Sequence, residues 1–125
     1  MIPSFIRAYE ASAAVLGFRI AAFTTPASAT TVAQATGGTV PLLGVFDRQG
    51  APVGGMPDVH RSGLVSVELG GTVAAGDPLT SDAQGRAIKA VPGAGATLNI
   101  IGFADQPGTS GDIIDAFMAL GTVRG

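Results

Sequence analysis

His60 is the only histidine of the chain, and it lies between Asp58 and Ser62 on one short segment. An acid, an imidazole and a hydroxyl are the groups of a hydrolytic triad, in which the imidazole takes the proton of the hydroxyl. The fold assembles such triads by geometry, so adjacency in the sequence is no evidence for one. We therefore expect His60 to be a polar surface or interface residue, and the sequence assigns no catalytic residue.

Aspartates are the next candidates, because carboxylate oxygens are ligands that calcium prefers. A calcium loop requires several such oxygens at close spacing, whereas Asp77, Asp82, Asp112 and Asp115 are single residues in separate turns. We expect these carboxylates to cap turns. The chain has no cysteine, and its glycines form neither a GxGxxG motif nor a phosphate-binding loop. The sequence thus assigns no metal site and no cofactor.

A Gly-Asp corner organises the second half of the chain. Gly76 can adopt a positive φ at low cost, Asp77 can accept hydrogen bonds from nearby amides, and Pro78 interrupts a hydrogen-bonded ladder. These three residues predict a structural turn that ends one strand and begins the next.

Two further turns repeat this chemistry. Loop 81–86 is a predicted hairpin with Gly85 at its left-handed position. Gly111 and Asp112 form a second Gly-Asp corner before an apolar strand. We expect the two corners to have similar geometry, although recurrence by chance is the alternative in a chain with 19 glycines.

Short apolar segments separated by glycine- and proline-rich turns predict an all-β protein. Polar and apolar residues alternate over 64–69, which is typical of an antiparallel sheet with one solvent-exposed face. The expected strands are 19–23, 31–35, 41–47, 58–69, 87–90 and 98–104.

The apolar segment 113–120 fits two periodicities. A helix would place Ile114 beside Phe117, whereas a strand would place it on one face with Met118 and Leu120. Because the rest of the chain predicts strands, we expect a strand here too.

The composition favours a protein whose surface is covered by partners. Only 13% of the residues are charged and 46% are hydrophobic, so a monomer would have limited solubility. We expect a homo-oligomer. A net charge of −2 and a single lysine argue against binding of nucleic acid through a basic patch. No segment approaches the roughly 20 apolar residues of a membrane helix, so we expect no membrane partner.

We expect the chain to divide into an extended N-terminal arm, residues 1–18, and a single β domain, residues 19–125. The arm carries the apolar side chains Ile2, Phe5, Ile6 and Tyr9. We expect these four residues to contact a neighbouring subunit or a capsid, the alternative being that they pack on their own domain. The arm should then serve attachment more than folding.

Several motifs together resemble a known family. They are GGTVAAGDPLTSDAQGRAIKA at 70–90, IIGFA at 100–104 and SGDIIDAFMALGTVRG at 110–125. Their order resembles that of the small head decoration proteins, or capsid cement proteins, of tailed phages. The resemblance covers 64–125 and departs from the family pattern at 56–63. The upstream segments TVAQAT and LLGVFD are similar in shape to the family's N-terminal strands.

The resemblance implies a compact β-barrel or β-sandwich of the β-clip or β-tulip type. It also implies a role without enzymatic activity: the protein would bind the major capsid protein on the outer surface of the virion, often as a trimer. Such a protein stabilises the head by bridging capsomers. The alternative function is that of a small β-barrel module that binds carbohydrate or peptide, but the chain has no tryptophan and one tyrosine with which to line a groove.

Overall fold

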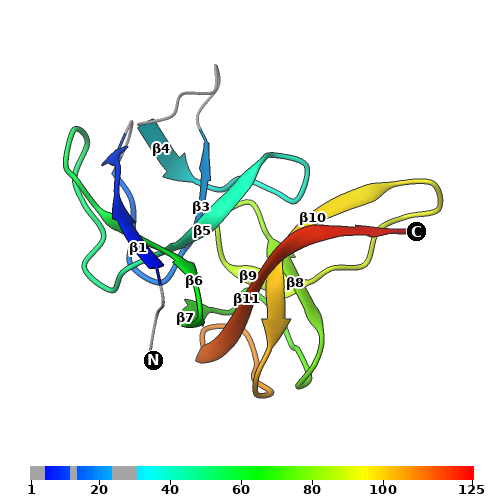
Figure 1. The fold of residues 1–125 in the computed structure, drawn as a ribbon. Coiled ribbons are helices and arrows are strands. Elements are labelled where there is room, and N and C mark those ends of the chain that lie inside the picture. The colour runs from blue at the N-terminus through cyan, green and yellow to red at the C-terminus, as the bar shows by residue number, and fades with distance from the viewer. Residues whose placement is uncertain (1–4, 12–13, 24–30) are drawn as a thin grey trace.

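The computed structural model describes residues 5–11, 14–23 and 31–125, with the backbone alone for residues 5–8. All regular elements in this part are strands, so the all-β prediction is confirmed. Figure 1 shows two lobes side by side, each built on one sheet. The strands are β1 (Phe5–Ala8), β2 (Glu10–Ala11), β3 (Ile20–Phe23), β4 (Thr31–Gln34), β5 (Leu42–Phe46), β6 (Asp58–Ser62), β7 (Leu64–Glu68), β8 (Pro78–Ser81), β9 (Ala87–Lys89), β10 (Thr97–Ala104) and β11 (Ile113–Arg124).

The first lobe is a six-stranded sheet with the order β1-β6-β5-β3-β4-β2. Its two edge strands, β1 and β2, are separated in the chain by Tyr9 alone. Cα atoms two residues apart lie within about 7 Å of each other, so the edges of the sheet must meet at Tyr9. The sheet is therefore curled into a barrel.

The N-terminal segment is part of this barrel, which corrects the expected arm. β1 pairs antiparallel with β6, and β2 pairs parallel with β4. The amides of Tyr9 and Ala11 donate to the carbonyl oxygens of Pro57 (3.2 Å) and Gly55 (2.9 Å). The segment is fixed because these backbone groups and the buried side chains of Tyr9 and Ala11 find their partners within the chain.

The barrel interior is filled by one apolar cluster, and a second cluster joins the barrel to the other lobe. Strand β5 contributes to both: Leu43 and Phe46 face the interior, and Leu42 and Val45 face the other lobe. A strand that is covered on both faces needs a nearly continuous apolar sequence, which LLGVF provides. The interior cluster consists of Tyr9, Ala11, Val15, Ala21, Val32, Leu43, Phe46 and Val59.

The second lobe is a five-stranded sheet with the order β7-β11-β10-β8-β9. The segment beginning at Ile113 is a strand, and it runs on to Arg124 between β7 and β10. Figure 1 shows the β10–β11 hairpin extending beyond the rest of this lobe, with the C-terminus at its end. No described residue lies in a helix that is long and apolar enough to cross a membrane.

Residues 58–69 were expected to form one strand, and the structure divides them between the two lobes. β6 belongs to the barrel and β7 to the five-stranded sheet, with Gly63 between them at a φ of 85°. The alternation of polar and apolar residues is correct for β7. It could not show the break, because a change of sheet alters the partners of a strand and not its periodicity.

The two Gly-Asp corners have the same turn geometry. Gly76 has a φ of 90° and Gly111 a φ of 91°, and neither hydrogen-bonded turn contains another positive φ. In each turn, the amide of the aspartate donates to the carbonyl oxygen three residues earlier, at 3.1 Å for Asp77 and 3.0 Å for Asp112. A positive φ at the third position identifies a type II turn, which favours glycine there.

The corners also occupy equivalent places in the sheet. The amide of Gly76 donates to the carbonyl oxygen of Ala104 (2.7 Å), and the amide of Gly111 donates to that of Leu69 (2.8 Å). Between the corners, Val73 exchanges two backbone hydrogen bonds with Gly108, at 3.0 and 3.2 Å. The second lobe therefore contains one strand-corner-strand unit twice, related by a local two-fold axis.

We expect Gly76→Val and Gly111→Val each to lower the free energy of unfolding by about 1–3 kcal/mol, because a β-branched residue at positive φ is strained. An added Cβ meets no atom within 4 Å at either position, so strain alone is measured. Ala75→Val is the matched control, at an exposed neighbouring position without positive φ. Urea unfolding checks the prediction, and equal losses for all three variants would contradict it.

The hairpin loop that follows β8 joins the second lobe to the barrel. Gly85, with a φ of 77°, accepts a hydrogen bond from the amide of Ile20 at 2.7 Å. The carbonyl oxygen of Gln84 accepts from Arg19 Nη1 at 2.9 Å and from Gln34 Nε2 at 2.6 Å. These contacts fix the relative position of the two sheets.

Candidate interaction surface

His60 is buried in the wall of the barrel, with 5% of its surface exposed. Its Nε2 atom lies 3.3 Å from Oδ1 of Asp47, a residue of the adjacent β5–β6 connection. The fold thus brings Asp47 to the imidazole, whereas Asp58 lies exposed at the start of β6. The two side chains form a hydrogen-bonded pair, in which the Asp47 side chain is 42% exposed and the imidazole is covered. This burial corrects the expectation that His60 would be a surface or interface residue.

The structure places the four predicted interface residues in different ways. Ile2 lies outside the described residues, and Phe5 and Ile6 are placed only as backbone positions of β1, opposite Ser62 and His60. Tyr9 is 2% exposed inside the barrel.

The position of Tyr9 corrects its assignment to an interface. Its hydroxyl accepts a hydrogen bond from Arg61 Nη1 at 2.8 Å, and its ring belongs to the interior cluster. A side chain that is covered by its own barrel has no surface left for a neighbour.

Three of the four aspartates considered as calcium ligands cap turns, as expected, whereas Asp115 lies within strand β11, which corrects its assignment to a turn. Asp77 accepts from the amide of Ala74 (2.8 Å), and Asp112 accepts from the amide of Thr109 (2.9 Å). Asp82 accepts from two backbone amides of its own hairpin, at 2.8 and 2.9 Å. Among the described residues, no group of three or more acidic, histidine or cysteine side chains is placed to hold a metal ion.

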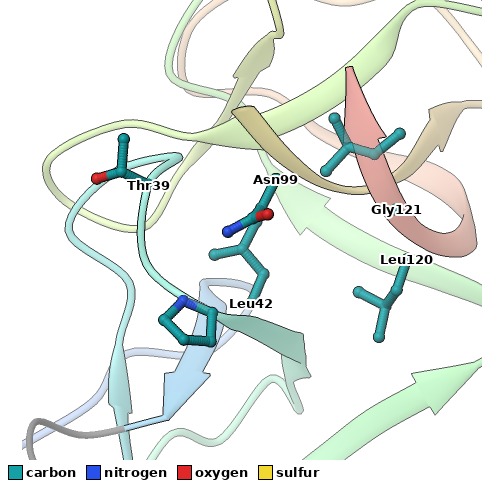
Figure 2. Close-up of a pocket in the computed structure, with 7 residues that line it drawn as sticks. Thr39, Leu42, Asn99, Leu120 and Gly121 are labelled. Atoms are coloured by element: carbon teal, nitrogen blue, oxygen red, sulfur yellow. The ribbon is translucent and has the colours of Figure 1, made fainter. Parts of the chain in front are cut away.

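A hollow of about 240 Å³ lies where β5 meets the β10–β11 hairpin (Figure 2). Its polar side chains are Thr39 and Asn99, and the Asn99 amide nitrogen already donates to the carbonyl oxygen of Val40 at 2.7 Å. The remaining lining residues, Pro41, Leu42, Ile100, Leu120 and Gly121, have no polar side chain. The hollow offers no acid, base or aromatic ring to a ligand, so it has the character of a packing gap.

The outer face of the five-stranded sheet carries an exposed apolar row. Leu64 of β7 lies opposite Phe117 of β11, which lies opposite Phe103 of β10, which in turn lies opposite Pro78 of β8. We call these four residues the aromatic row. It crosses four neighbouring strands, so the backbone hydrogen bonds of the sheet fix the relative positions of its members.

The two phenylalanines of the row are unusually accessible: Phe117 is 57% exposed and Phe103 is 42% exposed. Ile113, on the same face of β11, is 49% exposed. Their strand neighbours Ile114, Ala116 and Ala104 are buried below the sheet. Exposed apolar groups that gather on one rigid face are typical of a contact surface for another macromolecule.

An acidic pair lies next to the aromatic row. Asp115 shares the outer face of β11 with Phe117, and the amide of Asp105 donates to the carbonyl oxygen of Asp115 at 2.9 Å. Asp105 thus lies opposite Asp115, and each aspartate is two residues from the phenylalanine of its own segment. We call them the acidic pair. Adjacent like charges on neighbouring strands are unfavourable in an isolated sheet.

Sequence reasoning did not select Phe103 or Phe117. The sequence did contain one indication. Asp115 carries a charge, which marks its face of β11 as the solvent-exposed one, and Phe117, two residues later, lies on the same face. The pairing with Phe103 was not accessible, because it depends on the register of the β10–β11 hairpin, which the sequence of the connecting loop 105–112 does not define.

No family model matches the sequence, and no curated protein matches it. A solved structure does match: the N base of the head fiber protein gp8.5 in bacteriophage phi29. The TM-score is 0.68 at 17% sequence identity, and the match covers 92% of this chain and 93% of that chain. At this identity the likeness concerns the fold. The chain therefore shares its fold, over nearly its whole length, with the base of a phage head fiber.

Proposed function

We propose that this protein is a structural component of a tailed-phage head, which attaches to the outer face of the shell and stabilises it by bridging capsomers. The observation that carries the proposal is the likeness of fold to a phage head fiber base over almost the entire length of both chains. The ordered motifs of 64–125, which resemble those of head decoration proteins, support the same conclusion from the sequence.

The proposed mechanism is thermodynamic and involves no reaction. A protein that binds only the assembled shell, and contacts more than one shell subunit, shifts the equilibrium from separated subunits toward the shell by mass action. Its partner is the major capsid protein, its location is the outer surface of the virion, and it acts as a homo-oligomer, with a trimer favoured by the resemblance to decoration proteins. The alternative module that binds carbohydrate or peptide gains no support, because the hollow between β5 and the β10–β11 hairpin has no aromatic lining.

Electron microscopy of heads that lack the protein tests this function. On addition of the purified chain, we expect new density on the outer surface that contacts more than one shell subunit, together with a higher temperature of heat disruption of the heads. A control addition of thermally unfolded chain should leave both unchanged. Heads without new density, or with density and an unchanged disruption temperature, would contradict attachment or stabilisation, respectively.

A further inference from the structure

We propose that the aromatic row and the acidic pair together form the surface that binds the shell protein, at a site where an apolar depression is bordered by lysine or arginine side chains. This inference rests on the proposed function and adds the attachment face and the chemistry of its partner. The row would supply the buried centre of the contact, and the acidic pair would supply its charged rim.

The geometry of the row suits a buried centre. Phe103 and Phe117 lie directly opposite each other on paired strands, so they present one continuous aromatic surface. Both are held by a sheet whose other face is packed against the apolar cluster between the lobes. Rigid aromatic side chains lose little conformational entropy on binding, which is why interfaces are enriched in them.

The charges identify the occupant. Arg19 is 3.3 Å from Glu68, which lies opposite Ile113 on the outer face, and Lys89 is 3.9 Å from Asp77, so both of these cations already have partners. No described cation lies within ion-pair distance of Asp105 or Asp115. A partner that brings its own cation to the acidic pair relieves the repulsion between the two carboxylates.

The same charges disfavour a second copy of this chain as the occupant. Two such faces packed against each other would bring two acidic pairs into one contact, and the described cations without an ion pair, Arg48, Arg61 and Arg124, lie outside this patch, in the β5–β6 connection, in β6 and at the far end of β11. Like charges brought together in an interface suppress association. The occupant is therefore a different protein, with basic residues around an apolar centre.

The test measures binding of variants to heads that lack the protein, by co-sedimentation. Phe103→Ala/Phe117→Ala should bind at least about 30-fold more weakly, the effect of removing a central aromatic contact. Val53→Ala/Met56→Ala is the matched control: both residues are more exposed than the phenylalanines, and both lie in the β5–β6 connection of the barrel. We expect this control to bind within about twofold of the wild type, as surface substitutions outside a contact do.

A second pair of variants tests the rim. Asp105→Asn/Asp115→Asn should bind about fivefold more weakly at low salt, and this difference should vanish near 1 M salt, where exposed charges are screened. Glu10→Gln/Asp58→Asn removes the same two charges from exposed positions on the barrel, and it should bind as the wild type does.

The outcomes separate this inference from the function on which it rests. If the wild-type chain binds heads and the phenylalanine variant binds them equally well, the proposed attachment face is wrong and the proposed function stands. A wild-type chain that does not bind heads would overturn both. If the phenylalanine variant binds heads normally but loses self-association in sedimentation, the face belongs to a second copy of this chain, and the inference is wrong.

Discussion

Truncation of Tyr9 to alanine is expected to lower the free energy of unfolding by about 3–5 kcal/mol, the usual cost of removing a large aromatic side chain from a core. Tyr9 is 2% exposed and lies where the two edges of the barrel meet, so the cavity would open at the closure of the sheet. Its hydroxyl also accepts the hydrogen bond from Arg61. Chemical denaturation of the purified variant measures the loss.

Tyr9→Phe is the matched control, because it keeps the ring and removes the hydroxyl. We expect a smaller loss, about 1–2 kcal/mol, for the hydrogen bond from Arg61. The pair of variants decides between an attachment arm and a barrel strand. A Tyr9→Ala protein with wild-type stability and poor binding to heads would support the hypothesis of an attachment arm. A Tyr9→Ala protein with a lower free energy of unfolding would support the barrel strand.

Gly102→Ala is expected to lower the free energy of unfolding by about 3 kcal/mol or more, because overpacking and an unfavourable φ act together. A Cβ at this position would overlap the carbonyl oxygen of Phe117, which is backbone of the adjacent strand and cannot move without breaking the sheet. The φ of Gly102 is 154°, at the point where the β10–β11 register shifts.

Gly121→Ala provides the control on the same hairpin. The nearest atom to a Cβ there is 4.0 Å away, and the position is exposed, so we expect a change within about 0.5 kcal/mol. Thermal unfolding followed by circular dichroism compares the two variants. Equal losses of stability for Gly102→Ala and Gly121→Ala would contradict the prediction, and they would show that β11 can move at its bulge to accommodate the added Cβ.

The sequence by itself determined the local structure of this protein. Alternation within 64–69 and the Gly-Asp corners depend on properties of single residues, namely side-chain polarity and the φ angles that each residue tolerates. The first residues of 113–120 also follow the expected phase, since Ile114 and Met118 are buried. Local preferences of this kind are encoded within a few residues, which is why they could be inferred without the fold.

Leu120 shows where local inference ends. The strand pattern placed it on one face with Ile114 and Met118, which are buried, yet Leu120 is 44% exposed. The register of β10 and β11 shifts between Ile100 and Gly102, so β11 has one extra residue opposite this point and its alternation changes phase. A bulge is set by the pairing of two strands, and neither strand alone contains the information.

Only the tertiary structure decided which residues meet. Tyr9 has the same apolar character in an arm and in a barrel, and it is buried because the two edges of the sheet close around it. Phe103 and Phe117 become one surface through the register of a hairpin, and they stay exposed because the apolar cluster fills only the opposite face of the sheet. Contacts of this range depend on sheet order and curvature, which emerge from the packing of the whole chain and not from the pattern of any one segment.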